Sequence, residues 1–345
     1  MSGPAGQSRG RDLDEDDVRI RPGRRSRPRT KDRPSHDDAR RGYVVAVDRG
    51  RYTCRLGDMT SGVDGAEAGS EVIAMKAREL GRRSVVVGDR VAIVGDVSGD
   101  ADTLARIVRV EPRTSTLRRT ADDTDPFERV IVANADQLVI VTALADPPPR
   151  PRLIDRCLVA AFDAGLRPLL CLTKSDLKGP EELLETYRAL DVPHVVTRRG
   201  QSLEELRSQL TGRVSVLVGH SGVGKSTLVN ALVPGADRAT GGVNVVTGRG
   251  KHVSSSAVAL ELDGGGWVID TPGIRSFGVA HVDLDRIIRA FPELMPGTEG
   301  CPRGCTHDEA DCALDAWVAA GHADADRLES LRRLLRSRDE PEETG

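Results

Sequence analysis

The apolar residues in the first third of the chain come in short runs separated by turns. Between residues 42 and 112 the runs are YVVAV, YTCRL, EVIAM, SVVVGDRVAIVG and ARIVRV, with Gly and Asp between them. Runs of this length, rich in β-branched residues, predict strands. About five short strands in about 70 residues are typical of a small barrel of the OB or SH3 kind.

From about residue 130 the pattern changes to strands that alternate with amphipathic helices. The predicted strands are DQLVIVTAL, PLLCLTKSD, PHVVTR and VSVLVG, and the predicted helices are LIDRCLVAAFDAG, EELLETYRAL and SLEELRSQL. ALELDGGGWVIDTPG predicts a hairpin. Strands that alternate with helices indicate a mostly parallel, doubly wound sheet.

The two ends of the chain have different patterns. Beyond about residue 283, DRIIRAF, LDAWVAA and DRLESLRRLLR predict helices. Residues 1–41 contain almost no large apolar side chain and are rich in Arg, Asp, Pro, Ser and Gly, so we expect a disordered arm. Both a solubilising tail and an arm that contacts RNA phosphates fit this composition.

Composition and charge change this picture little. The 345 residues suffice for two or three domains, and 38% hydrophobic with 30% charged residues is usual for a globular protein. No apolar run approaches the ~18 residues of a membrane span, and no charged-then-apolar leader opens the chain. We therefore expect a cytoplasmic protein without membrane contact.

The predicted barrel carries arginines that could form a basic face for RNA. Its aromatic residues are limited to Tyr43 and Tyr52, so base stacking is not the expected mode. The candidate arginines are Arg78, Arg82, Arg83, Arg106, Arg109 and Arg113.

A phosphate-binding sequence lies between a predicted strand and a predicted helix. It fits G-x-x-x-x-G-K-[S/T], and this context is the one the pattern requires. Glycines let backbone N–H groups face phosphate oxygens at the start of the helix. We expect Lys225 to reach the β- and γ-phosphates and the Ser226 hydroxyl to bind Mg²⁺. The predicted site residues are Gly219, His220, Ser221, Gly222, Val223, Gly224, Lys225, Ser226 and Thr227.

A second motif, Asp270-Thr-Pro-Gly273, ends a predicted strand about 45 residues beyond the phosphate loop. At this distance it matches the D-x-x-G sequence of nucleoside triphosphatases. We expect Asp270 to hold Mg²⁺ through water and the Gly273 N–H to contact the γ-phosphate.

A third motif, which includes Thr173, Lys174, Ser175 and Asp176, follows the strand PLLCL. It resembles the [N/T]-K-x-D motif that reads guanine. A carboxylate there accepts two hydrogen bonds from guanine, and adenine lacks that pair of donors. Thr197-Arg198, after the strand PHVV, is a weaker candidate for a loop that supports the base. The predicted ligand is therefore GTP.

The order of these motifs is unusual, because Asp176 precedes Gly219. GTPases of the common order have the phosphate loop first. A doubly wound domain tolerates such a circular permutation because the termini of compact domains often lie close together. The segment from about 240 to 274 then leads directly into the C-terminal helices.

Three cysteines and a histidine cluster near the C-terminus as Cys301-x3-Cys305-x-His307-x4-Cys312. In a cytosolic chain such a cluster suggests a metal rather than disulfides. Three thiolates and one imidazole complete a tetrahedral Zn²⁺ site without an open position, so its role would be structural. Redox-active or incidental cysteines are the alternative.

Taken together, these features resemble the RsgA family (also called YjeQ or EngC), GTPases that depend on the small ribosomal subunit. The resemblance covers about residues 42–335. It implies a multi-domain fold: an arm (1–41), an OB-fold β-barrel (42–115), a circularly permuted α/β P-loop GTPase (116–280) and a mostly helical zinc-binding domain (281–345). The implied cofactors are one structural zinc ion per subunit and Mg²⁺ with GTP.

The resemblance also implies a reaction and partners. The enzyme would hydrolyse GTP to GDP and phosphate during late maturation of the small (30S) ribosomal subunit, stimulated by its rRNA. A monomer is expected. Lys225 and Gly273 would serve hydrolysis, and His252, in a segment that matches the family's G-[R/K]-H-T-T/S-T switch, would help to position water or contact rRNA. An ordinary loop histidine is the alternative.

Several positions depart from the patterns of known GTPases. Val253 replaces a hydroxyl residue of the family, which leaves three serines, 254–256, as possible Mg²⁺ ligands. Ile274 stands where Ras-like GTPases have a water-orienting Gln, so we expect slow intrinsic turnover until a partner completes the site. Gly222 occupies the place of the Asn of potassium-activated GTPases. The first two cysteines have one residue fewer between them than in the family.

Two other functions remain open from the sequence. The chain could be a permuted GTPase that acts on another ribonucleoprotein, for example the large subunit. It could also be an RNA-binding module with a vestigial nucleotide site, although Lys225, Ser226 and Asp270 are all present.

Overall fold

The computed structural model describes residues 36–57, 59, 69–81, 84–100, 103–119, 129–236, 257–271, 277, 279 and 282–339. The arm predicted for residues 1–41 lies almost wholly outside this range. Within it, 11 strands join in one sheet and two more form a separate ribbon. None of the described helices combines the length and apolarity that a bilayer crossing needs.

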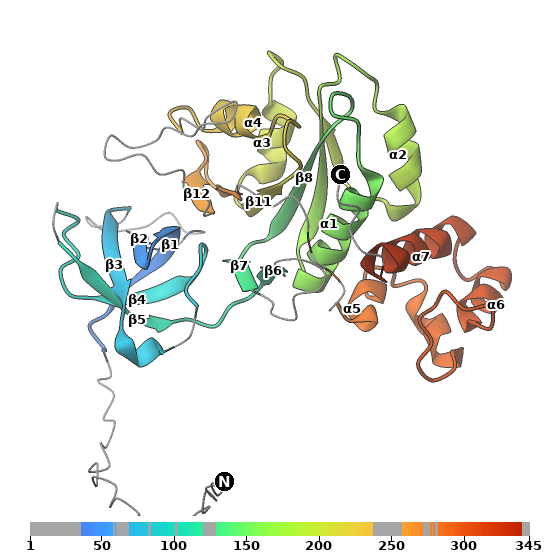
Figure 1. Cartoon of the computed structure of the whole chain (residues 1–345), viewed down its shortest axis with the longest axis horizontal. Helices are drawn as coiled ribbons and strands as arrows, with labels where there is room; N and C mark the ends of the chain where they lie inside the picture. Colours follow the sequence, from blue (N-terminus) through green and yellow to red (C-terminus); the bar gives the residue numbers. More distant parts are fainter. Residues whose placement is uncertain are drawn as a thin grey trace, which may run out of the picture. The chain divides into compact units, whose positions relative to one another are not determined.

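The first strands close into the predicted N-terminal barrel (Figure 1). They pair in the order β1-β2-β3-β5-β4, and β1 also pairs with β4, which closes the barrel. Alternate residues point inward, as in β3, where Val72 and Ala74 are buried between exposed neighbours. The strands are β1 (Arg40–Asp48), β2 (Arg51–Leu56), β3 (Glu71–Lys76), β4 (Arg90–Val94) and β5 (Ala105–Val110), and the short helix η2 (Arg78–Leu80) follows β3.

The central part is the predicted doubly wound α/β fold. Its strands run in the order β10-β9-β8-β11-β13-β12, all parallel except the last. The strands are β8 (Gln137–Ala143), β9 (Arg167–Thr173), β10 (His194–Val196), β11 (Val214–Val218), β12 (Val258–Glu261) and β13 (Trp267–Asp270). The helices are α1 (Pro151–Ala164), α2 (Glu181–Tyr187), η3 (Arg188–Leu190), α3 (Glu204–Leu210) and α4 (Lys225–Leu232).

Both faces of this sheet are buried, which explains why its strands read as continuous apolar runs. Strand β8 shows how one strand serves two cores. Leu138 and Ile140 belong to the core that contains α1 and α2, whereas Val139 and Val141 belong to the core that contains α3 and α4.

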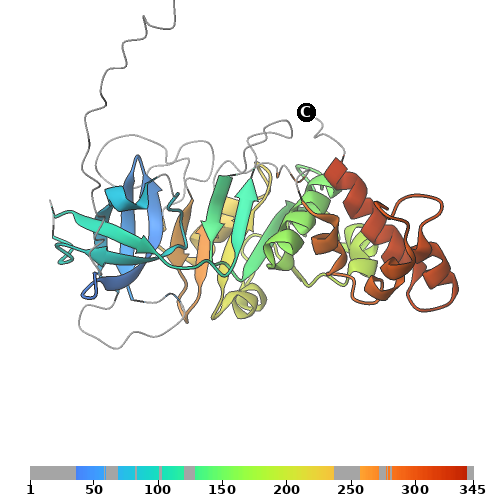
Figure 2. The same cartoon turned by 90° about the horizontal axis from the view of Figure 1, so that it is seen from below.

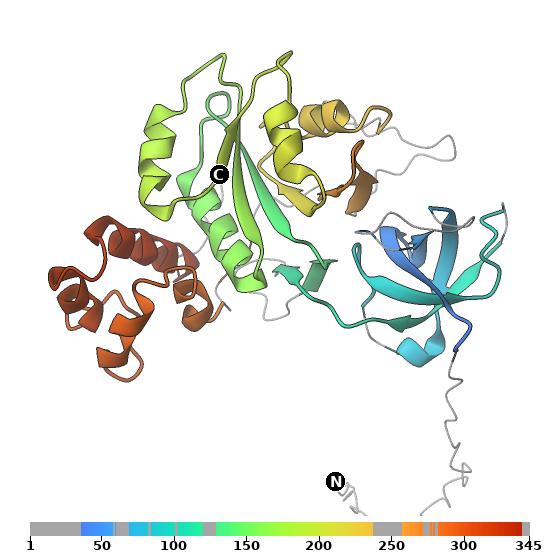
Figure 3. The ribbon, with the colours of Figure 1, turned by 180° about the vertical axis from the view of Figure 1, so that it is seen from behind.

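The C-terminal helices lie against α1 on the side away from the sheet (Figures 2 and 3). The apolar side chains of α7, Leu328, Leu331, Leu334 and Leu335, belong to the same core as α1. The elements are α5 (Leu284–Ile288), η4 (Met295–Gly300), α6 (Ala313–Ala319) and α7 (Ala325–Asp339).

The barrel and the central sheet are joined through an edge strand. β1 pairs with β12 at Ala46 and Val258, so one sheet runs through both parts. Trp267 at the start of β13 donates from its indole N–H to the Met59 carbonyl oxygen (3.1 Å) and meets Tyr43 edge-on, with ring centroids 5.1 Å apart. A small ribbon of β6 (Thr116–Arg119) and β7 (Arg129–Ala133) lies between barrel and sheet in sequence.

One arginine of the predicted basic face pairs with a buried carboxylate of the barrel. Arg113 donates from Nε to Asp89 Oδ1 (2.7 Å) and from Nη2 to Asp89 Oδ2 (2.8 Å). The Asp89 side chain is fully buried, and Arg113 is its cationic partner. A buried carboxylate needs a charged partner, so Arg113 stabilises the barrel, and its part in an RNA-binding face stays a prediction.

Candidate functional site

The three sequence motifs lie at one edge of the central sheet. The phosphate loop follows β11, the Thr173–Asp176 motif follows β9, and Asp270 is the last residue of β13. Because these strands are parallel, their carboxyl ends meet at the same edge, where α/β folds bind ligands.

The phosphate loop is shaped by its glycines. Gly222 and Gly224 have φ values of 83° and 92°, in the left-handed region that side chains disfavour. A Cβ on Gly219 would lie 2.4 Å from the Val141 carbonyl oxygen, so the loop runs close against β8. Helix α4 begins at Lys225 directly after Gly224. Its first N–H groups are free of intrahelical partners and can bind an anion.

Lys225 and Asp270 lie next to each other beside this loop. The Lys225 ammonium donates to Asp270 Oδ1, and both side chains are largely buried. Thr271, the residue after Asp270, donates from its hydroxyl to the Leu217 carbonyl oxygen (2.8 Å), which fixes the end of β13 against β11. The lysine predicted to bind phosphate and the carboxylate predicted to hold Mg²⁺ are thus neighbours.

The guanine motif touches the phosphate loop directly. The Thr173 hydroxyl donates to the Val223 carbonyl oxygen at 2.6 Å, and both residues are buried. Strands β9 and β11 are separated only by β8. The permuted order of the two motifs is therefore compatible with one shared site.

The rest of the guanine motif forms a turn at the end of β9. Lys174 has a φ of 58° and donates from its ammonium to the Asp146 carbonyl oxygen. The Ser175 N–H donates to the Thr197 carbonyl oxygen (3.3 Å), so the predicted base-supporting loop lies beside the motif. Asp176 is exposed.

An opening of about 460 Å³ connects the two motifs. Lys174, Asp176 and Thr197 line it on one side, and Gly222, Gly224 and Thr227 on the other. This volume is in the range of small-molecule sites. Residues of the lining that the sequence did not indicate include Leu177, Arg199, Gln201, Leu203, Leu228 and Ala231. Arg199, Gln201 and Leu203 follow the end of β10, and Leu177 directly follows Asp176, so the positions after β9 and β10 were the signal that could have indicated them.

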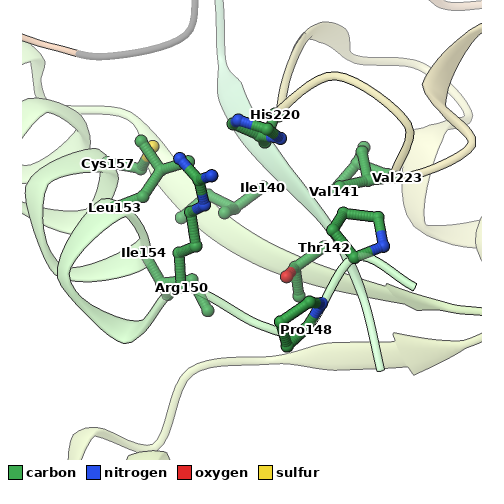
Figure 4. Close-up of a pocket in the computed structure, with 12 residues that line it drawn as sticks. Ile140, Val141, Thr142, Pro148, Arg150, Leu153, Ile154, Cys157, His220 and Val223 are labelled. Carbon is green, nitrogen blue, oxygen red and sulfur yellow. The ribbon is translucent and has the colours of Figure 1, made fainter. Parts of the chain in front are cut away.

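A second, much smaller pocket lies between the phosphate loop and α1 (Figure 4). It holds about 10 Å³, roughly the space of one water molecule, and cannot admit a nucleotide. Its lining includes His220, Arg150 and Cys157. His220 Nδ1 lies 2.8 Å from the Ser221 carbonyl oxygen. The imidazole is therefore hydrogen-bonded to the main chain of the phosphate loop.

The cysteine–histidine cluster assembles as predicted. The donor atoms of Cys301, Cys305, His307 and Cys312 all lie within 4.8 Å of one another. Cys301 Sγ is 3.8 Å from Cys312 Sγ and 3.6 Å from His307 Nδ1. Tetrahedral Zn²⁺, with its usual bond lengths, requires about 3.8 Å between sulfurs and about 3.6 Å between sulfur and nitrogen. The cluster can hold a metal ion of this size.

Neighbouring residues orient these ligands. Arg332 donates to the His307 carbonyl oxygen (2.9 Å) and forms a two-pronged ion pair with Asp315. Glu309 accepts from the Thr306 N–H and from the Cys305 thiol. Desolvation raises the pKa of the Cys305 thiol to about 12 and lowers the pKa of His307, which favours the neutral imidazole, the form that binds metals. A bound cation would have to favour the thiolates.

Some predicted site residues lie outside the described part of the chain. These are His252 and Gly273, together with Val253, the serines at 254–256 and Ile274.

Comparisons with known proteins agree with this geometry. Residues 110–280 match the family described as RsgA GTPase. Two relatives named small ribosomal subunit biogenesis GTPase RsgA come from Ectopseudomonas mendocina and Chlorobaculum parvum. The first is 42% identical to this chain, and the match covers 74% of this chain and 75% of the relative. The second is 41% identical, and the match covers 87% of this chain and 98% of the relative.

Solved structures are also similar. YjeQ from Thermotoga maritima is 28% identical, with a TM-score of 0.62 over 87% of this chain and 98% of its own. YloQ, described as a circularly permuted GTPase, has a TM-score of 0.61 and is 22% identical. The match covers 89% of this chain and 98% of YloQ, which supports the fold. With the permuted motifs at one sheet edge, these matches show that the chain belongs to the RsgA GTPase family.

Proposed function

We propose that this protein binds GTP in the opening between β9 and α4 and hydrolyses it during late maturation of the small ribosomal subunit. The observation that carries the proposal is the hydrogen bond from Thr173 to the Val223 carbonyl oxygen, which joins the guanine motif to the phosphate loop. The relatives named for small-subunit biogenesis supply the link to the ribosome.

In this proposal the phosphate loop and Asp270 hold the triphosphate and Mg²⁺. The backbone from Gly219 to Gly224 and the start of α4 would bind the β-phosphate, with Lys225 between the β- and γ-phosphates. The Ser226 hydroxyl would bind Mg²⁺ and Asp270 would hold it through water, which the contact between Lys225 and Asp270 supports. Mg²⁺ would neutralise charge that develops on the phosphate oxygens.

The opposite end of the opening would read the base. Asp176 would accept hydrogen bonds from the N1–H and the exocyclic amine of guanine, while the Lys174 stem packs along the ring. Thr173, Ser175 and Thr197 would hold the turn in place, since their hydrogen bonds connect it to the phosphate loop and to β10. His252 and Gly273 remain proposed contributors to hydrolysis from the sequence alone.

We assign zinc to the C-terminal cluster and a structural role to the ion. All four donors face one point, and four protein ligands leave no position for water. The ion would hold the loop between η4 and α6 in place against α7, to which Arg332 connects it.

The cellular setting follows from the proposed partner. We propose a monomer that works in the cytoplasm, where ribosomal subunits are assembled, with domain limits near 42–115, 116–280 and 281–345. Phosphate contacts to rRNA would make binding sensitive to salt.

GTP turnover with and without purified small subunits tests this function. We expect slow turnover of the protein alone and stimulation when small subunits, but not large subunits, are added. Equal stimulation by both subunits, or indifference to both, would favour a GTPase that acts elsewhere. No turnover under any condition would favour an RNA-binding protein with a vestigial site.

A further inference from the structure

Helix α1 carries two neighbouring ionisable residues in the protein interior. Asp155 is 3% exposed and Arg156 is 1% exposed. Burying a charged group is costly unless it is well bonded, so the partners of such a group indicate what it holds in place. Asp155 pairs with Arg333 of α7, with 3.3 Å between Arg333 Nε and Asp155 Oδ2.

Arg156 connects α1 to two further segments. Its Nε donates to the Phe277 carbonyl oxygen at 2.8 Å, and its Nη1 lies 3.5 Å from the Ser337 carbonyl oxygen in the last turn of α7. Phe277 follows the D-x-x-G motif that begins at Asp270. One guanidinium therefore touches both the main chain beyond this motif and the C-terminal helix.

Two more described residues, Val279 and Val282, follow Phe277 in the sequence before α5 begins. Phe277, Val279 and Val282 are all buried in the core shared with α1. At the far end, Arg338 of α7 donates to the Val282 carbonyl oxygen (3.1 Å). Helix α7 therefore binds the main chain at Val282, and Arg156 of α1 binds it at Phe277.

Packing alone does not require an arginine at this position, since an apolar side chain would fill the same space. A buried carbonyl needs a donor, however. Guanidinium presents donors in several fixed directions, so it can serve carbonyls of two different segments at once, whereas the single ammonium of a lysine is a poor substitute.

We propose that Arg156 is a positioning residue that couples the chain following the D-x-x-G motif to α7. A shift of the Phe277 main chain between the GTP and GDP states would be passed through the guanidinium to α7. The inference rests on the proposed function, because it needs GTP and GDP to be distinguished at Asp270 and the phosphate loop.

Hydrogen exchange with GDP and with a non-hydrolysable GTP analogue tests the coupling without ribosomes. In the wild type, amides of α7 should exchange at rates that differ between the two nucleotides by about tenfold, a size typical of coupling between sites. In Arg156→Met this difference should disappear, while α4 remains protected by nucleotide.

A matched control separates coupling from simple docking of the helix. Arg327 of α7 is a partly buried arginine that donates to the Ala189 carbonyl oxygen (2.8 Å) and to Glu293 Oε1 (2.5 Å), and neither partner lies between Phe277 and Val282. Arg327→Met should lower thermal stability but keep the nucleotide-dependent difference in α7. Loss of the difference in both variants would mean that Arg156 only anchors the helix, and would overturn the proposal.

Other outcomes are equally decisive. If Arg156→Met does not fold, Arg156→Lys serves instead, and it should reduce the difference at least by half; full retention overturns the inference. If nucleotides protect α4 of the wild type but leave α7 unchanged, the coupling is wrong and the proposed function stands. If neither nucleotide protects α4, the proposed nucleotide site fails and the coupling fails with it.

Discussion

The cysteine–histidine cluster and the nucleotide site differ in the sequence distance over which they are assembled. All four candidate ligands of the cluster lie between Cys301 and Cys312, within one loop. The nucleotide site joins Thr173 to Val223, 50 positions apart, through strands that pair in a parallel sheet. The cluster should therefore depend on its metal, and the nucleotide site on the sheet, so damage to one should leave the other largely intact.

The largest expected effect is on the metal. Cys301→Ala removes one of four ligands, and structural Zn²⁺ sites contribute on the order of 10 kcal/mol. Bound zinc, measured by mass spectrometry of the purified protein, should fall from one per chain to nearly none, while GTP affinity changes less than about threefold. Cys157→Ala, an isolated buried cysteine, should keep the metal. Full zinc content in the Cys301 variant would rule out this ligand set.

The next effect is on the phosphate end of the nucleotide site. Lys225→Ala removes the ammonium that lies beside Asp270, and charge-assisted hydrogen bonds to phosphate are strong, so we expect a loss of GTP affinity of about 10²-fold or more. Calorimetric titration measures it, and zinc content should not change. The surface variant Lys178→Ala, which only loses a pair with Glu182, is the control. Tight GTP binding by the Lys225 variant would refute the phosphate-loop assignment.

A smaller effect concerns the choice of base. Asp176→Asn should lower the preference for GTP over ATP by about 10- to 100-fold, because a mismatched polar group costs about 1–3 kcal/mol. Xanthosine triphosphate should bind this variant better than the wild type, since its C2 carbonyl can accept from the new amide. Competition with a fluorescent GTP analogue measures all three affinities, and Asp191→Asn is the control. An unchanged GTP/ATP ratio would mean that the base is read elsewhere.

The smallest effect concerns the contact between the two motifs. Thr173→Val removes the hydroxyl that donates to the Val223 carbonyl oxygen and should weaken GTP binding by about 3- to 10-fold, because one buried hydrogen bond contributes about 1 kcal/mol. Thr186→Val, on a surface helix, should have no effect on GTP. If affinity does not change, the two motifs do not depend on this contact, and the comparison with the local cluster loses its main support.

Much of the fold could be predicted from the apolar pattern. The five barrel strands, the alternating strands and helices from about residue 130, and the C-terminal helices were all confirmed, because each has a clear pattern of apolar residues. The ribbon of β6 and β7 was missed, since its strands are short and half-buried and show little alternation. The pairing of Arg113 with Asp89 was not predicted, because the two residues are 24 positions apart.

The sequence by itself determined which residues are candidates for chemistry: the phosphate loop, Asp270, the Thr173–Asp176 motif and the four candidate metal ligands of the cluster. Their residue types and spacing imply function because the geometry is local. Only the tertiary structure decided that Thr173 meets Val223, that β12 pairs with β1, and that Arg156 lies between Phe277 and α7. These contacts depend on which strands and helices pack together, a balance of long-range packing energies that no short stretch of sequence records.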